Sequence, residues 1–421
     1  MPAATQWCPS CRATIETERG WAPWCPECDW GVDPTPEDRT GEGLVERWWR
    51  QRLNRVSERE HAVLMRDGLE RSPAIGSGLV LVLSTVVHVV TLLVLAAAPA
   101  VLLSGLPGVF RYPLTLLLLG IVWEVAPIPR GRRPQGVLLT PAEAPETHAL
   151  VVEVAEKLGV RPPESVIVND EVNASWHSVG LTRRRVLVLG LPLWASLDAQ
   201  GKVSLLGHEL GHEASNDLRR SWYVGGAVRS LDAWRELLTP EVSDLRDGGV
   251  VPYVVYLVQW LIVALTIPLL VGLTLLEILL ATLALRAGQH AEHVADRLGA
   301  GLAGRAAALE AERTIVRAHS LDFALGVELR RDRDADVWQA TRDHLASVPP
   351  HEEARLLRLA AVTLQAVDSS HPPTTRRLEL LAQAPDHAPS LVLAPEREAR
   401  VDTEIRSASG WVARRLRERR R

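Results

Sequence analysis

The chain has 421 residues and a formal net charge of −4. At roughly 150 residues per domain, this length predicts two or three structural units. The charge balance excludes a strongly basic protein, so we expect no nucleic-acid partner.

The four cysteines all lie near the N-terminus, in two C-x-x-C pairs formed by Cys8, Cys11, Cys25 and Cys28. This spacing predicts a four-cysteine ribbon over residues 1–35 that holds one structural zinc. The alternative is two disulfides or idle thiols, but a disulfide between residues three apart is strained. The polar, proline-containing N-terminus does not resemble a cleavable signal peptide, so we expect a reducing compartment. Ribbons of this kind position substrates or bind a protein partner.

Residues 36–75 are expected to form a linker and a charged, solvent-exposed helix. The uncharged run 78–98 is long enough to cross a bilayer. A turn with Arg111 follows, and the shorter apolar run 113–127 leads the chain back. Residues 76–128 therefore predict an N-terminal transmembrane hairpin.

Residues 203–217, VSLLGHELGHEASND, contain the motif H-E-x-x-H. On a helix, positions i and i+4 share a face, so His208 and His212 can direct two imidazoles at one metal ion. Neutral imidazole is a good zinc ligand, and Glu209 beside the metal can accept a proton from an attacking water. Gly207 and Gly211 leave room for a neighbouring backbone. Residues 129–249 are thus expected to be the first part of a peptidase domain.

A second apolar block covers residues 250–286 and is divided by Pro268 into two halves. By composition it could cross a membrane once, twice or not at all, or re-enter from one side. The number of crossings follows from the position of the third metal ligand, which lies after this block in the sequence.

A catalytic zinc needs three protein ligands and one open position. In residues 289–303, Glu292 and Asp296 lie four residues apart on one helical face. Glu292 would bind the metal and Asp296 would accept the N–H of a ligating imidazole. His290 and His293 are the alternative ligands. If Glu292 meets the H-E-x-x-H helix, the apolar block crosses an even number of times and is expected to be a second transmembrane hairpin.

Three motifs in sequence order now resemble one family. They are GHELGH followed by Asp217, then EHVADRLGA, then HPPTTRRLELL at 371–381. They are similar to the integral-membrane zinc metallopeptidases of the HtpX and CAAX prenyl protease type, and the similarity covers residues 74–385. The resemblance implies His208, His212 and Glu292 as zinc ligands, Glu209 as general base and Asp296 as the partner of a ligand.

The resemblance also implies residues that assist the reaction. His371 and Arg377 match the family's His-Pro segment, where such residues support the site or stabilise the oxyanion. Asn173 and Ala174 match an edge-strand segment that binds an extended peptide as an added strand. Residues 287–385 would complete the peptidase domain. The ribbon and the Arg-rich tail 386–421 are additions to the family pattern.

The expected fold is a mixed membrane protein with α-helical transmembrane hairpins, an α+β zincin-like metallopeptidase domain and a small N-terminal zinc ribbon. We expect an endopeptidase with one catalytic and one structural zinc, acting on membrane or membrane-associated polypeptides in quality control or processing. The alternative is a membrane-anchored adaptor with a vestigial zincin site. We expect a multi-pass plasma membrane protein of a bacterium. The arginines around the first hairpin predict that its catalytic domain and both termini lie in the cytoplasm.

Overall fold

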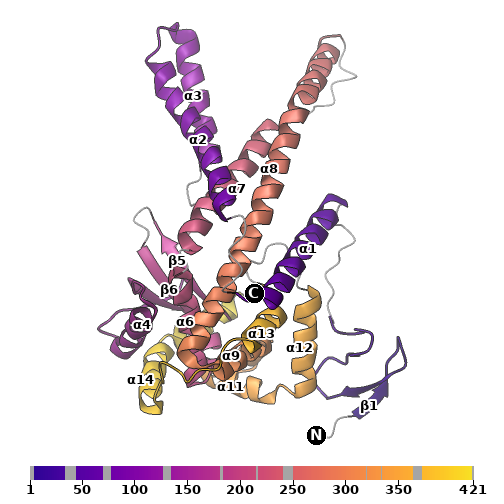
Figure 1. Cartoon of the computed structure of the whole chain (residues 1–421), viewed down its shortest axis with the longest axis vertical. Coiled ribbons are helices and arrows are strands. Elements are labelled where there is room, and N and C mark those ends of the chain that lie inside the picture. The colour runs from indigo at the N-terminus through magenta and orange to yellow at the C-terminus, as the bar shows by residue number, and fades with distance from the viewer. Residues whose placement is uncertain are drawn as a thin grey trace. The chain divides into compact units, whose positions relative to one another are not determined.

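The structure is a computed structural model that describes residues 4–33, 44–69, 77–126, 134–180, 184–214, 217–239, 250–318, 320–332, 334–363 and 372–419 (Figure 1). The chain divides into two compact units. One unit, here called the sheet-containing unit, comprises residues 1–73, 131–217 and 289–421. The other, the helical unit, comprises residues 74–130 and 218–288.

The helical unit is built from α2 (Ser77–Leu102), α3 (Gly108–Val125), α7 (Asp217–Leu238) and the first part of α8 (Val250–Ala303). In the described part of the chain, α2, α3 and α8 are the helices long and apolar enough to cross a membrane. Valine and leucine side chains cover their outer surfaces, as lipid contact requires. These features confirm the expected membrane helices.

The prediction of a hairpin within 250–286 is wrong, because α8 continues through Pro268 as one helix. A proline removes one backbone hydrogen bond, and membrane helices tolerate this loss. A turn between two membrane helices also needs polar residues, because its backbone is exposed to water. The residues on either side of the proline, Ile267 and Leu269, are apolar. A single apolar helix therefore occupies the block that was assigned two crossings.

Helix α7, which precedes α8 in the chain, packs against α2 and α8. Its residues Val224, Ala227 and Leu231 are buried in one cluster with Val80 of α2 and Leu280 of α8. This cluster forms a hydrophobic core of the helical unit, and α7 is therefore part of that unit.

The sheet-containing unit holds a four-stranded sheet in the order β3-β4-β6-β5. Its strands are β3 (Val137–Leu139), β4 (Ser165–Asn169), β5 (Ala174–Val179) and β6 (Arg184–Gly190). Strands β4 and β6 are parallel, and β5 is antiparallel to β6 with Ala174 opposite Leu189. The apolar run of β6 is buried, as expected for a central strand. Among the described residues, no further strand pairs with the outer side of the edge strand β5.

Helices surround this sheet and complete the unit. Before α6 in the chain come α1 (Leu44–Asp67), α4 (Pro145–Leu158) and α5 (Leu191–Ser196). The H-E-x-x-H motif lies in α6 (Ala199–Ala214), which is buried almost throughout. The remaining helices are α9 (Arg305–Ala318), α10 (Leu321–Arg331), α11 (Val337–Ser347), α12 (Pro350–Thr363), α13 (Thr374–Ala382), α14 (Pro395–Arg406) and α15 (Ser409–Glu418).

Helix α6 and the last turns of α8 touch backbone to backbone. A Cβ atom at Gly207 would lie 2.8 Å from the Cα of Gly299, and one at Gly299 would lie 2.7 Å from the carbonyl oxygen of Ser204. Such separations leave no room for a side chain. Glycine at both positions therefore sets how closely the two helices approach.

The C-terminal segment is also part of the sheet-containing unit. Lys202 of α6 is fully buried, and its Nζ donates to Glu398 at 2.7 Å and to both carboxylate oxygens of Asp402 at 2.8 Å. The indole of Trp194 donates to the same Asp402 at 2.9 Å. Since both acids lie on α14, the Arg-rich segment 386–421 includes a helix that neutralises a buried charge on the H-E-x-x-H helix.

Replacing Gly299 by alanine should force α6 and α8 apart and destabilise the fold by about 2 kcal/mol, the usual cost of overpacking. The measurement is the midpoint of thermal unfolding in detergent. Gly301→Ala is the matched control, because a Cβ there meets nothing within 4 Å. Equal melting midpoints for both variants would show that the close approach is not needed.

Asp402→Ala should destabilise the protein by about 3 kcal/mol, because it leaves the buried Lys202 ammonium with one acidic partner instead of two. The control is Asp386→Ala, which removes an exposed ion pair with Arg305 and should cost less than about 1 kcal/mol. Chemical unfolding followed by tryptophan fluorescence compares the two. Similar losses would contradict a bracing role for α14.

Candidate active site

Two histidines and one glutamate converge between α6 and α8. His208 Nε2 lies 3.6 Å from Glu292 Oε2, and His212 Nε2 lies 3.6 Å from Glu292 Oε1. The ligand atoms of all three residues lie within 4.8 Å of one another, and all three residues are buried. Ligands about 2.1 Å from one tetrahedral ion lie about 3.4 Å apart, so this donor set fits zinc.

A buried charge network surrounds His208. Its Nδ1 lies 2.8 Å from Asp296 Oδ1, which leaves Nε2 turned to the other two ligands. Arg377 donates through Nε to Asp296 Oδ2 at 2.9 Å and through Nη2 to Asp296 Oδ1 at 2.5 Å. The same Nη2 donates to Glu312 Oε1 at 2.7 Å. Two buried carboxylates thus hold one guanidinium directly behind the imidazole.

Burial and charge act in opposite directions on these groups. Burial lowers the pKa of His208, but the hydrogen bond from its ring to Asp296 and the negative charge nearby raise it to about 9. Burial raises the pKa of Glu312, and the positive charge of Arg377 opposes that rise. Although burial alone would lower it, the charges of Asp296 and Glu312 raise the pKa of Arg377 well above its ordinary value. The guanidinium is therefore charged and holds both acids together.

A cavity of about 400 Å³ opens beside these residues. His208 and Glu209 line it, together with Asn173 just before the edge strand β5. Ala174 is the first residue of β5, and the carbonyl of Asn173 accepts a hydrogen bond from the backbone of Gly190 at 2.9 Å. The cavity thus lies beside both the H-E-x-x-H motif and a strand edge where a peptide could pair.

The structure places the remaining sequence candidates as follows. Among the described residues, His290 and His293 do not belong to the group of possible metal ligands that contains Glu292. His371 lies outside the described residues. Arg377 has two of its nitrogens directed to carboxylates.

Glu312 of α9 was not predicted. It is an acidic residue among the apolar positions Ala308, Ala311 and Ile315 of one amphipathic helix. An acid on an apolar helical face is the signal that could have indicated it, since a buried carboxylate needs a partner.

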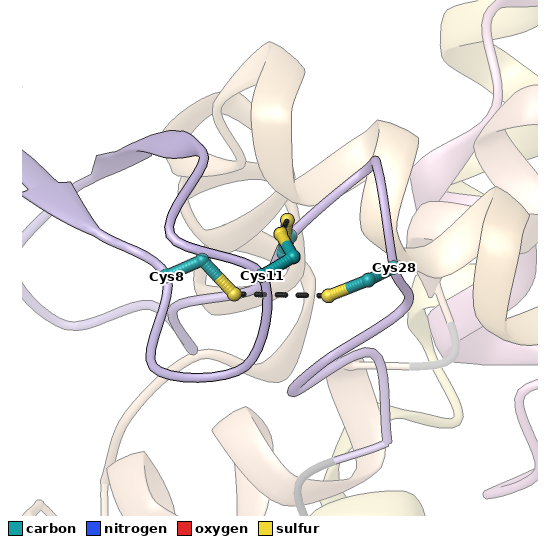
Figure 2. A group of neighbouring side chains, drawn as sticks. Cys8, Cys11 and Cys28 are labelled. Atoms are coloured by element: carbon teal, nitrogen blue, oxygen red, sulfur yellow. Dashed lines mark hydrogen bonds between the residues drawn. The ribbon is translucent and has the colours of Figure 1, made fainter.

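The second ligand cluster is the four-cysteine ribbon, which contains β1 (Ala4–Trp7) and β2 (Thr14–Thr17). All four cysteines are free thiols, and their sulfur atoms lie close together, with Cys8 3.7 Å from Cys28 (Figure 2). Sulfurs about 2.3 Å from one tetrahedral zinc lie about 3.8 Å apart.

The two C-x-x-C loops of the ribbon have the same backbone turn. The residues after the second cysteines, Arg12 and Asp29, have φ values of 62° and 60°. Their amides donate back to the carbonyls of Cys8 and Cys25 at 2.9 and 3.0 Å. Both loops therefore present their thiols in the same way, which supports the zinc ribbon.

The ribbon contacts α12 of the same unit through specific polar groups. Arg358 donates to both carboxylate oxygens of Asp29 at 2.7 and 2.6 Å. The buried Arg355 donates to the carbonyl of Val32 at 2.6 Å, and the indole of Trp24 donates to the carbonyl of His351 at 3.1 Å. Helix α12 in turn packs against α9 and α13, which carry Glu312 and Arg377.

Comparison with protein families agrees with this geometry. A family model described as Peptidase family M48 matches residues 141–384, which include α6, the end of α8, α9 and α13. Comparisons with curated proteins and with solved structures find no match. The matched region covers more than half of the chain and contains both the H-E-x-x-H helix and the Glu-bearing helix. The chain therefore belongs to peptidase family M48, a family of zinc-dependent metallopeptidases that includes the HtpX type.

Proposed function

We propose that the protein is a zinc endopeptidase that cleaves membrane or membrane-associated polypeptides. The observation that carries this proposal is the convergence of His208, His212 and Glu292, with Glu209 lining the adjacent cavity. We propose two zinc ions, one held by these three ligands and one by the four cysteines. The zinc at the first site would supply Lewis acidity toward the scissile carbonyl.

In the proposed reaction each neighbouring residue has one task. Glu209 accepts a proton from the attacking water and then gives it to the leaving amine. Asp296 accepts the Nδ1–H of His208 and so keeps Nε2 available to the metal. Arg377 neutralises Asp296 and fixes its orientation. The edge of β5 at Asn173 and Ala174 binds the substrate backbone as an added strand.

The oxyanion of the tetrahedral intermediate needs its own donor. Because Arg377 directs Nε and Nη2 to Asp296 and Glu312, we propose that it positions Asp296 rather than approaching the substrate. His371, from the family's His-Pro segment, is the proposed oxyanion donor.

Glu209→Gln should retain the metal and lower the rate of peptide cleavage by at least about a thousandfold, because an amide cannot accept the proton. Cleavage of an unfolded protein and zinc content are measured on the same preparation. Glu213→Gln, one turn further along α6, is the control and should stay active. Full activity in Glu209→Gln would exclude this mechanism.

The rival proposal is a membrane-anchored adaptor that binds a partner through its ribbon and has a vestigial site. A vestigial site has no need to keep a general base and three buried ligands in one place. The observed set of Glu209, His208, His212 and Glu292 therefore supports the enzyme. Both the quality control of membrane proteins and their selective processing require cleavage of peptide bonds, so the proposed endopeptidase activity is compatible with either role.

We further propose that the catalytic residues face the cytoplasm of a bacterium. Arginines lie before α2 and after α3, whereas the opposite end of this hairpin holds Arg111 alone, in the first turn of α3 and not in the turn that the sequence predicted. His212 and Glu292 bind one metal, so the chain between them crosses the membrane an even number of times. Helix α8 supplies one crossing, and we propose that α7 supplies the other.

Helix α7 is not among the helices apolar enough to cross a membrane and carries Arg229 and Asp232 in its second half. The proposal that it crosses rests on its length and on its polar contacts inside the bundle. Its 22 residues reach about 33 Å, the thickness of a bilayer core. Tyr223 donates its hydroxyl to Thr85 at 2.8 Å, and Ser230 donates to the carbonyl of Val125 at 2.7 Å. Arg235 lies 3.4 Å from Glu277 of α8. Polar groups with partners inside the bundle are tolerated in a membrane.

Single cysteines test this topology in intact cells treated with an impermeant thiol reagent. Leu106→Cys, between α2 and α3, and Thr239→Cys, after α7, should be labelled. Thr140→Cys and the wild-type protein should not be labelled. Labelling at Thr140 but not at Leu106 would invert the topology, and protection at Thr239 would show that α7 does not cross.

A further inference from the structure

The turn between β4 and β5, residues 170–173, leads the chain from the sheet to the active-site cavity. Val172 and Asn173 of this turn line the cavity together with Glu209, and Ala174 begins the edge strand β5. A polypeptide that pairs with β5 as an added strand needs backbone groups in fixed positions, because a misplaced edge weakens every hydrogen bond of the pairing. The contacts that hold the turn therefore affect substrate binding.

Groups of the sheet itself hold one side of the turn. The side chain of Asn169 accepts a hydrogen bond from the backbone N–H of Glu171 at 3.1 Å, and the carbonyl of Asn173 accepts one from Gly190 at 2.9 Å. A Cβ atom at residue 190 would overlap the carbonyl oxygen of Glu171. The turn thus lies directly against the end of β6.

Asp170, the first residue of the turn, has a charge that these hydrogen bonds do not neutralise. Its side chain is only 4% exposed, and its Oδ2 lies 2.8 Å from Nε of Arg419. Nη2 of the same arginine lies 3.9 Å from Oε1 of Glu171. A carboxylate removed from water is costly unless it is paired, so the position of Asp170 depends on the arginine.

Helix α15 is fixed in the unit and ends where it can supply this arginine. Val412 and Leu416 of the helix are buried, and α15 packs against α10 and α11. Arg419 follows directly after the helix, and Arg415 lies one turn before it on the same face. Arg415 donates to the side chain of Gln135 at 3.2 Å.

The register of the sheet shows that both arginines contact the same end of it. Strands β3 and β4 pair with Val137 opposite Val168. Continued by two residues, this register brings Gln135 opposite Asp170. One face of α15 therefore contacts the chain before β3 and the chain after β4, at the end of the sheet where β5 begins.

We propose that Arg419 is a positioning residue for substrate binding. Its ion pair with Asp170 holds the β4–β5 turn, and thereby the start of the edge strand, in the place where an extended polypeptide pairs with it. The proposal rests on the endopeptidase function proposed above and gives the C-terminal segment a part in it. Arg419 lies beyond residues 141–384, the region that the family model matches.

The first test measures kcat and KM for cleavage of casein, an unfolded protein, by the zinc-loaded full-length protein in detergent. Arg419→Ala should raise KM about fivefold and leave kcat within about twofold of the wild-type value, because it loosens the turn without touching the reacting groups. Arg419→Lys keeps the charge and should recover most of the loss. Arg414→Ala is the control, since Arg414 is exposed and lies off the face that carries Arg415 and Arg419.

The second test measures binding without cleavage, by fluorescence anisotropy of labelled casein added to the Glu209→Gln protein. Introducing Arg419→Ala should raise Kd about fivefold, and Asp170→Asn should have a similar effect. Together the two substitutions should raise Kd no further than either alone, because both remove the same ion pair. Effects that multiply would show that the two residues act separately and would overturn the proposal.

The remaining outcomes separate the two proposals. Unchanged KM and Kd in Arg419→Ala, or a fall in kcat alone, would overturn the positioning role and leave the endopeptidase standing. An equal rise of KM in Arg414→Ala would also overturn it, since general positive charge would then be the cause. If the wild type binds casein but cleaves none, the endopeptidase fails and the Kd values decide the role of Arg419. Absence of casein binding by the wild type would overturn both.

Discussion

The backbone contact between Gly207 of α6 and Gly299 of α8 is the constraint on which the proposed metal site depends. The two histidines lie on one helix and Glu292 lies on the other, so the distance between these helices decides whether the three ligands can share an ion. A side chain at either glycine would lie within 3 Å of backbone atoms of the facing helix. The ligand geometry is thus a consequence of helix packing that has no room for a Cβ atom.

Charged groups from distant parts of the sequence hold this helix pair in place. Arg377 of α13 and Glu312 of α9 fix Asp296, which orients His208. At the other end of α6, the acids of α14 neutralise the buried Lys202. The ribbon binds α12, which packs against α9 and α13. The N-terminal and C-terminal additions therefore contact the peptidase unit directly, and neither is a separate appendage.

Local spacing predicted the parts of the site that lie on one helix face. The i, i+4 pairs indicated the two histidines, and the same spacing in α8 indicated Glu292 and Asp296. Two features were not predictable in this way. Pro268 was read as a break because proline ends helices in water, whereas the membrane helix continues through it. Glu312 was missed because its partner lies 65 residues away in sequence, so the contact exists only after folding.

The central claim is that the two histidines and Glu292 hold a zinc ion distinct from the one in the ribbon. Zinc K-edge X-ray absorption of the intact protein, combined with its zinc content, tests this most directly. We expect two zinc ions per chain and an averaged first shell that is half sulfur at about 2.3 Å and half nitrogen or oxygen at about 2.0 Å. A single zinc ion per chain with an all-sulfur shell would contradict the claim.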